Sequence, residues 1–268
     1  MEQQEKFSLI KLAKTVAILG GVTGLKYFRQ PGLQIKNKLS NGFDPVTEAD
    51  QKSEDKMRSY IKNMRPNDGI VGEEQGISSG TSGFTWFLDP IDGTRAFISG
   101  IPVWTVLVSV SKDGQPVLGV VYQPFTQEFF IGGLGFSEYT RNHLSIKLSV
   151  RQCKSLEAAF LSTTFPEIGT ALERKAFQAV AMRVRLCRYG LDAYAYALLA
   201  AGHLDLVIEA GLKPYDVHAP IALIEAAGGI VTNWSGGPAV DGGQIMACGD
   251  ESIHQAALAI LSKKSFNQ

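Results

Sequence analysis

Cysteine is scarce in this sequence, and the few that occur form no recognisable pattern. Cys153, Cys187 and Cys248 lie far apart, and no Cys-x-x-Cys pair occurs. An odd number of widely spaced cysteines argues against a disulfide framework, and the missing pair argues against a zinc cluster. This usage is typical of a reducing cytosol, so we predict a cytoplasmic location.

An excess of charge of either sign is also missing. Lysine and arginine together number 26, aspartate and glutamate also number 26, and the formal net charge is zero. Nucleic-acid binders usually carry a basic excess, so we predict no nucleic-acid partner. With 268 residues, 45% of them hydrophobic, the chain is long enough for one large domain or two modest ones.

Long hydrophobic runs are absent as well. The longest uncharged run near the N-terminus, residues 15–25, is too short to span a bilayer, and Lys11 and Lys14 precede it. We therefore predict no membrane association. Apolar residues between positions 9 and 19 recur at helical spacing, which predicts an amphipathic first helix.

The rest of the chain divides near residue 145 into a first half richer in strand signals and a second half in which strand and helix signals alternate. Patterning in the first half predicts a loop or short hairpin over 35–50, a helix over 47–60, a flexible loop over 76–83, and strands over 69–76, 84–88, 103–111, 116–124 and 128–133. In the second half it predicts strands over 158–164, 203–210 and 245–249, helices over 173–184, 192–202 and 251–264, and a further helix ending at Gly228 and Gly229. We predict an α/β (α+β) fold with halves 1–145 and 146–268.

The stretch FLDPIDGT, residues 87–94, places two carboxylates where a buried strand ends. Pro90 fixes the turn, and Asp92 follows Asp89 by three residues, so a turn can aim both carboxylates at one point. Two partly desolvated like charges are costly unless a cation lies between them. The following Gly93 and Thr94 can start a helix whose amides bind an anion. The alternative is that both aspartates are ordinary cap and turn residues.

Other acidic positions accompany this stretch. Glu73 and Glu74 follow a short strand just upstream, and Asp216 directly precedes a predicted helix. Asp50 lies in DPVTEAD, near a helix start. Taken singly, Asp216 is an ordinary helix cap and Asp50 a solvated residue of the first turn.

Taken together, these motifs resemble the inositol monophosphatase superfamily of metal-dependent phosphatases. The resemblance rests on DPVTEAD (44–50), GEE (72–74), LDPIDGT (88–94), YDVHAP (215–220) and AGG (227–229), and it covers nearly the whole chain. It implies a layered αβαβα sandwich of the inositol monophosphatase and fructose-bisphosphatase type, a homodimer, and Mg²⁺ as cofactor. Two or three Mg²⁺ ions per site are expected, since paired metals stabilise attacking and leaving oxygens together.

The resemblance also implies roles for individual residues. The metal ligands would be Glu73, Asp89, the carbonyl of Ile91, Asp92 and Asp216, with Asp89 bridging two ions. Asp50 and Thr94 would activate the attacking water, with Glu73 beside them, and the amides of Gly93 and Thr94 would contact the phosphate. Lys38, in a metal-binding loop over 35–44, is the candidate for the family's lysine.

The region 188–216 resembles the histidinol-phosphate phosphatase branch more than inositol monophosphatases. Asp192, which follows Gly190, and Glu209 are the candidate substrate-binding carboxylates, and two carboxylates suit a substrate with an ammonium group and an imidazole. The alternatives are that Asp192 caps the Ala-rich helix and that Glu209 pairs with Lys213. His218 is predicted at the surface, with a substrate contact as its alternative, and Pro220 is tolerable only in a first helical turn.

Three functions therefore stay open. The leading one is hydrolysis of L-histidinol phosphate in histidine biosynthesis, with a small phosphorylated metabolite as the only partner besides a second copy of the chain. The second is an inositol-1-monophosphatase or a broader sugar-phosphate phosphatase. The third is a non-catalytic metal- or phosphate-binding regulatory protein, against which the complete ligand set argues.

Overall fold

The structure is a computed structural model, and it describes residues 1–37 and 45–262. The helices are α1 (Gln3–Leu25), α2 (Glu48–Met64), α3 (Thr94–Ile98), α4 (Ala171–Ala181), α5 (Ala193–Ala200), α6 (Pro214–Ala226) and α7 (Glu251–Leu261). The strands are β1 (Ile35–Asn37), β2 (Pro45–Thr47), β3 (Gly69–Gly72), β4 (Gly76–Ser78), β5 (Phe84–Asp92), β6 (Thr105–Lys112), β7 (Gln115–Gln123), β8 (Glu128–Gly133), β9 (Phe136–Arg141), β10 (Leu144–Lys147), β11 (Phe160–Thr163), β12 (Leu186–Tyr189), β13 (Leu206–Leu212), β14 (Ile230–Thr232) and β15 (Gly243–Cys248).

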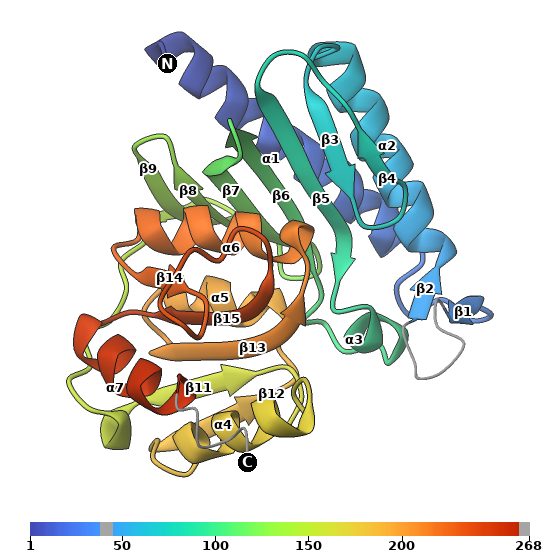
Figure 1. The fold of residues 1–268 in the computed structure, drawn as a ribbon. Helices are drawn as coiled ribbons and strands as arrows, with labels where there is room; N and C mark the ends of the chain where they lie inside the picture. Colours follow the sequence, from blue (N-terminus) through green and yellow to red (C-terminus); the bar gives the residue numbers. More distant parts are fainter. Residues whose placement is uncertain (38–44, 263–268) are drawn as a thin grey trace.

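Two large sheets and three layers of helices make up most of the described molecule, and β1 and β2 form a separate two-stranded sheet (Figure 1). The eight-stranded sheet has the order β10-β9-β8-β7-β6-β5-β3-β4, and the five-stranded sheet has the order β12-β11-β13-β15-β14. The helices α1 and α2 cover the outer face of the larger sheet, and α5 and α6 lie between the sheets. The outer face of the smaller sheet packs against α4 and α7. The predicted αβαβα sandwich is therefore confirmed.

The helix α6 lies unusually close to the larger sheet. A Cβ atom on Gly119 of β7 would stand 2.2 Å from the carbonyl oxygen of Ala219, and one on Gly132 of β8 would stand 2.6 Å from the Cα of Leu223. Only glycine fits where a helix backbone approaches a sheet backbone so closely. Because its other side faces β14 and α5, α6 is held between both sheets.

Most of the long predicted elements are present, with shifted ends. The predicted strand 84–88 continues to Asp92, because its pairing with β6 resumes at Thr105 after an irregularity that accommodates Pro90. The predicted loop 76–83 contains β4, and β9, β10, β12 and β14 were not predicted. These strands are short or lie at sheet edges, where solvent contact weakens the hydrophobic pattern. The division into halves at residue 145 stays a prediction.

The N-terminal helix is longer than the apolar pattern indicated. By length and composition, α1 is the one helix in residues 1–37 and 45–262 that could cross a membrane, but half of its apolar window is buried inside the molecule. Core helices of soluble proteins pass the same test. Leu9, Ala13 and Val16 belong to the core between α1, α2 and the larger sheet, so the observed packing is that of a core helix.

Candidate active site

The end of β5 gives the two aspartates of FLDPIDGT different surroundings. Asp89 is buried, and its Oδ1 accepts a hydrogen bond of 3.0 Å from the backbone N–H of Ile91. Asp92 Oδ2 accepts a bond of 2.7 Å from the N–H of Ala193, at the start of α5. The turn role considered from the sequence is therefore observed for Asp89, whereas Asp92 bonds a distant segment of the chain. Both carboxylates also have a neighbour in common, because each lies close to the carboxylate of a third acidic residue.

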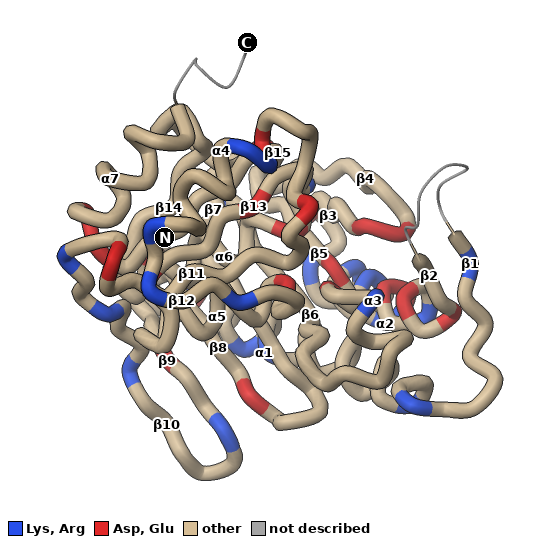
Figure 2. The backbone as a smooth tube through the Cα atoms, turned by 90° about the horizontal axis from the view of Figure 1, so that it is seen from below, with Lys and Arg blue, Asp and Glu red and all other residues tan. Residues whose placement is uncertain are grey.

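That third acid is Asp216, in the first turn of α6. Its Oδ2 accepts a bond of 2.7 Å from the N–H of Lys213, so it also helps to cap the helix. One carboxylate oxygen each from Asp89, Asp92 and Asp216 lies within 4.8 Å of the others. Figure 2 shows acidic positions from several elements gathered around β3, β5, β13 and α3.

The electrostatics of this acidic cluster favour a cation. Burial raises the pKa of Asp89 well above its usual value, and the charges of Glu73, Asp92 and Asp216 raise it further. Burial also raises the pKa of Asp92, with repulsion from Asp192 the next cause. Hard carboxylate oxygens gathered at this spacing suit a divalent ion such as Mg²⁺, which would remove the repulsion. The donor set present therefore fits a metal.

Glu73 reaches the cluster from a turn that other buried charges fix. Its N–H donates to the carbonyl of Leu88 at 3.2 Å, which ties the turn after β3 to β5. Glu54 of α2, fully buried, accepts from the N–H of Glu74 at 2.8 Å and of Gln75 at 3.1 Å. Arg58 donates to Glu54 at 2.6 Å and also bonds the carbonyl of Gly76. This Glu54–Arg58 pair was not predicted, because its only signal in the sequence is two opposite charges at i,i+4.

Asp50 is buried rather than solvated, so that alternative is wrong. Its Oδ2 accepts from the N–H of Thr47 at 2.8 Å and from the Thr47 hydroxyl at 2.5 Å. Its other oxygen, Oδ1, lies 3.5 Å from the Thr94 hydroxyl oxygen, which lies 3.1 Å from the Ile91 carbonyl oxygen, so the single hydroxyl proton has two alternative acceptors. Burial raises the pKa of Asp50 to about 6, although its bonds with Thr47 lower it.

Gly93 and Asp192 lie against each other. Gly93 has φ of +82°, and a Cβ atom there would stand 3.2 Å from the carboxylate of Asp192. Asp192 holds the N-cap position of α5 but makes no capping bond with its side chain, so the capping alternative is wrong. Burial raises its pKa to about 6, against the charge of Arg95, which lowers it.

Glu209 completes the acidic side of a cavity of about 240 Å³. Its Oε1 accepts from both the N–H and the hydroxyl of Thr164, at 3.0 and 2.8 Å, in place of the Lys213 pairing considered from the sequence. Burial raises the pKa of Glu209 to about 8. The same cavity is lined by Asp92, Asp192 and Asp216, so the predicted substrate carboxylates and metal ligands share one space.

Gly190 and Phe165 lie near the same cavity. Gly190 has φ of +81° and donates its N–H to the carbonyls of Thr163 and Thr164, beside the same cavity. Phe165 lines this cavity and lies 4.5 Å from the guanidinium of Arg95, a contact that the sequence analysis did not anticipate. Lys38 lies outside the described residues.

His218 and Pro220 depart from their predicted places. The prediction of a surface histidine is wrong, because His218 is 3% exposed, bonds Ser111 at 2.7 Å and the Val240 carbonyl at 2.9 Å, and stacks on Phe87. Pro220 lies beyond the first turn of α6, because the helix already starts at Pro214. Pro220 lacks the N–H that would bond the carbonyl of residue 216. The helix α6 therefore contains one backbone hydrogen bond fewer at the residue that belongs to the acidic cluster.

Several known proteins are similar to this chain over most of its length. Residues 6–265 match the model of the inositol monophosphatase family. The chain is 41% identical over 248 residues, 88% of this chain and 70% of the relative, to the chloroplastic bifunctional phosphatase IMPL2 of Arabidopsis thaliana. It is 34% identical over 243 residues, 88% of this chain and 92% of the relative, to the histidinol-phosphatase of Mycobacterium tuberculosis. A solved inositol monophosphatase from Zymomonas mobilis superposes with a TM-score of 0.85 at 35% identity, covering 98% of this chain and all of the other.

Proposed function

Because this chain belongs to the inositol monophosphatase family, and so is a metal-dependent phosphoric monoester hydrolase, we propose that it hydrolyses L-histidinol phosphate with Mg²⁺ as cofactor. The proposal rests above all on one observation: two carboxylates besides the metal-binding cluster, Asp192 and Glu209, line the cavity beside it.

We assign the metal to the acidic cluster. Glu73, Asp89, the carbonyl of Ile91, Asp92 and Asp216 would hold two or three Mg²⁺ ions. Bound there, Mg²⁺ supplies charge neutralisation for the phosphate and lowers the pKa of water. The protein's own contribution is rigidity, since Asp89 is fixed by the Ile91 amide, Asp92 by the Ala193 amide and Asp216 by the Lys213 amide.

Asp50 and Thr94 are the proposed acid–base pair. Thr47 fixes one oxygen of Asp50 through two hydrogen bonds, which leaves the other oxygen directed at the Thr94 hydroxyl. A carboxylate with a pKa of about 6 is ionised at neutral pH and can still accept a proton efficiently. The Thr94 hydroxyl would orient the attacking water, and Asp50 would take its proton by way of this hydroxyl. Glu73 would act beside them, and the amides of Gly93 and Thr94 would hold the phosphate.

Asp192 and Glu209 are the proposed specificity groups. Burial disfavours the ionised form of both, so each gains from a cationic partner, and a charge-assisted hydrogen bond to an ammonium group supplies one. A neutral polyol offers no such compensation. Relatives described as histidinol-phosphatases support this choice, including one from Chlorobaculum parvum at 28% identity over 94% of the chain.

A second candidate is hydrolysis of inositol 1-phosphate or sugar phosphates. It is favoured by a relative from Aquifex aeolicus, described as a fructose-1,6-bisphosphatase/inositol-1-monophosphatase, that is 28% identical over 98% of both chains. A third, a regulatory role without catalysis, is suggested by the Nus factor SuhB of Pasteurella multocida at 31% identity over 81% of the chain. We also propose a cytoplasmic homodimer.

Phosphate release from a small panel tests the substrate. We expect kcat/KM with Mg²⁺ to be at least about a hundredfold higher for L-histidinol phosphate than for inositol 1-phosphate or fructose 1,6-bisphosphate, about 2.7 kcal/mol of transition-state discrimination. A flat profile or a preference for a neutral polyol phosphate would overturn the histidinol assignment. No turnover of any ester with Mg²⁺ would favour the regulatory alternative.

The variant Glu209→Gln tests the same assignment at one residue. It keeps the side-chain shape and an oxygen for Thr164 but removes the charge. We expect KM for L-histidinol phosphate to rise about tenfold or more, as for a charge-assisted bond of about 1.5–3 kcal/mol, with a much smaller change for inositol 1-phosphate. The neutral substrate serves as the internal control for folding and metal binding. Equal increases for both substrates would contradict an amine-binding role.

A further inference from the structure

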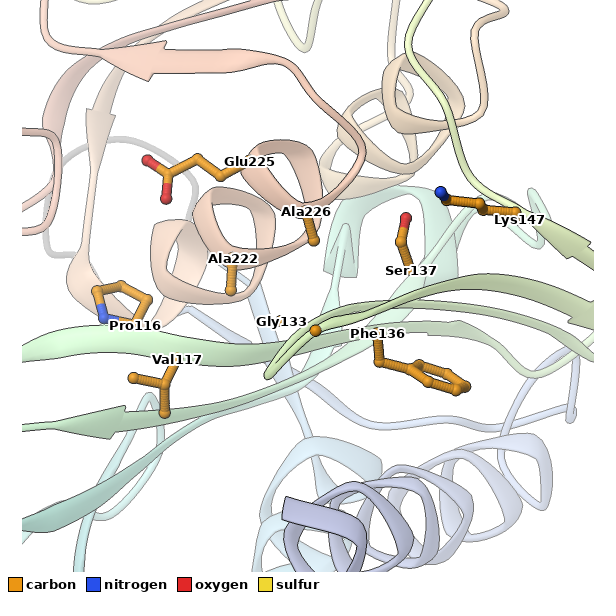
Figure 3. Close-up of a pocket in the computed structure, with 10 residues that line it drawn as sticks. Pro116, Val117, Gly133, Phe136, Ser137, Lys147, Ala222, Glu225 and Ala226 are labelled. Carbon is orange, nitrogen blue, oxygen red and sulfur yellow. The ribbon is translucent and has the colours of Figure 1, made fainter. Parts of the chain in front are cut away.

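A second cavity, of about 380 Å³, lies away from the acidic cluster. The last two turns of α6 form one wall through Ala222 and Ala226, and the start of β7 and the end of β8 form the other (Figure 3). Gly135, in the turn between β8 and β9, faces open space, since a Cβ atom there would meet nothing within 4 Å. The helix wall is therefore formed by small uncharged side chains, the sheet wall includes Val117 and Phe136, and the cavity lies between them.

Opposite charges lie at the two ends of this cavity. Figure 3 shows the Glu225 carboxylate at one end and the Lys147 amine with the Ser137 hydroxyl at the other, with the two alanines of α6 between them. In the described part of the chain, neither Glu225 nor Lys147 has an ion-pair partner, although each lines the same cavity as the other. Both residues are exposed to solvent, and two charges of opposite sign at the two ends of one cavity fit a ligand that carries the complementary charges at its own two ends.

The helix strengthens the anionic end. Glu225 stands in the last turn of α6, which contains no basic residue. The C-terminus of a helix carries partial negative charge, so a carboxylate there is unfavourable and a cation favourable. Partial burial of the Glu225 carboxyl raises its pKa, although the residue as a whole is exposed to solvent. An ammonium group at this end would meet the carboxylate and the helix terminus together.

We propose that this cavity binds a small linear zwitterion, with its ammonium group at Glu225 and its carboxylate at Lys147 and Ser137. The neutral walls formed by Ala222, Ala226 and the strand ends contact the middle of such a molecule. The ligand class is that of ω-amino acids and short peptides. The site is separate from the acidic cluster and does not depend on the identity of the hydrolysed ester.

Calorimetric titration of the full-length protein at low salt tests the proposal. The probes are glycine, 4-aminobutanoate and 6-aminohexanoate, with hexylamine and hexanoate as singly charged controls. We expect at least one of the longer zwitterions to bind at least about tenfold more tightly than either control, and to raise the thermal unfolding midpoint by mass action. No binding of any zwitterion at millimolar concentration would overturn the proposal.

Variants then locate the binding. Glu225→Gln and Lys147→Met should each weaken binding of the zwitterion about tenfold or more, and Glu225→Gln should leave the weak binding of hexanoate unchanged. Ala226→Met keeps both charges but fills the space between them, so it should abolish binding. Glu157→Gln and Lys62→Met, exposed residues elsewhere, are the matched controls. Binding that survives all three cavity variants, in proteins that melt like wild type, would overturn the assignment.

Discussion

Replacing Asp89 by asparagine is expected to abolish phosphate release while making the metal-free protein more stable. Asparagine keeps the oxygen that accepts the Ile91 N–H, so the turn is retained. It removes a buried carboxyl group. Burial raises the pKa of this group, and the carboxylates of Glu73, Asp92 and Asp216 raise it further. An acid with a raised pKa in the folded state lowers stability above its unfolded pKa, so without metal the variant gains stability at neutral pH.

The two effects are measured separately. We expect kcat/KM with Mg²⁺ to fall by at least about 10³-fold, or about 4 kcal/mol, because the residue proposed to bridge two metals no longer carries charge. Thermal unfolding in a chelator should show a higher midpoint than wild type, and the increase that Mg²⁺ gives wild type should be lost. Exposed Glu157→Gln is the control for loss of a charge. Turnover at the wild-type rate, or an unchanged response of the midpoint to Mg²⁺, would contradict the metal assignment.

The second large effect is expected at Glu54, which makes no contact with substrate in our proposal. Glu54→Gln leaves the Arg58 guanidinium, only 4% exposed, without its counter-charge, and turns an amide NH₂ toward the donors that Glu54 now accepts from. Breaking a buried ion pair on one side costs about 3–5 kcal/mol, so the free energy of unfolding in urea should fall by that amount. Mg²⁺ affinity should fall as well, since the turn carrying Glu73 loses its anchor.

The same helix offers a matched control. Glu48 and Lys52 form an ion pair at the same i,i+4 spacing, but both side chains are about half exposed, at 53% and 50%. Glu48→Gln should therefore change the free energy of unfolding by less than about 1 kcal/mol. Adding Arg58→Met to Glu54→Gln should restore part of the loss, because it removes the unpaired buried charge. Equal costs at Glu48 and Glu54 would show that burial of the pair is unimportant.

The proximity of Asp89, Asp92 and Asp216 could be predicted only in part from the residues themselves. A turn after a strand can aim Asp89 and Asp92 in one direction, but taken singly all three are ordinary cap and turn residues. The family resemblance joined Asp216 to the other two, which lie far away in the sequence. By contrast, α1, α2 and the β6–β7 hairpin could be predicted from local patterns, because their hydrophobic periods are long.

What escaped prediction depends on tertiary packing. Burial of His218 follows from the close approach of α6 to the sheet at Gly119, which no pattern around residue 218 reveals. The hydrogen bonds from Thr164 to Glu209 join residues 45 apart in sequence. The Glu54–Arg58 pair looks like any solvated pair on a helix surface until the turn at Gly72 covers it, where a Cβ atom would stand 2.2 Å from Glu54.

The position of α6 between the sheets also bears on how the protein folds. Asp89 and Asp92 end a strand of the first sheet, whereas Asp216 belongs to a helix that needs both sheets to hold it. Contacts between segments so distant in sequence form late, because the loop between them must close before they yield any stabilisation. During synthesis, the N-terminal carboxylates emerge long before Asp216 does. We therefore expect a metal ion to bind only after the two sheets have come together, and to slow unfolding rather than to speed folding.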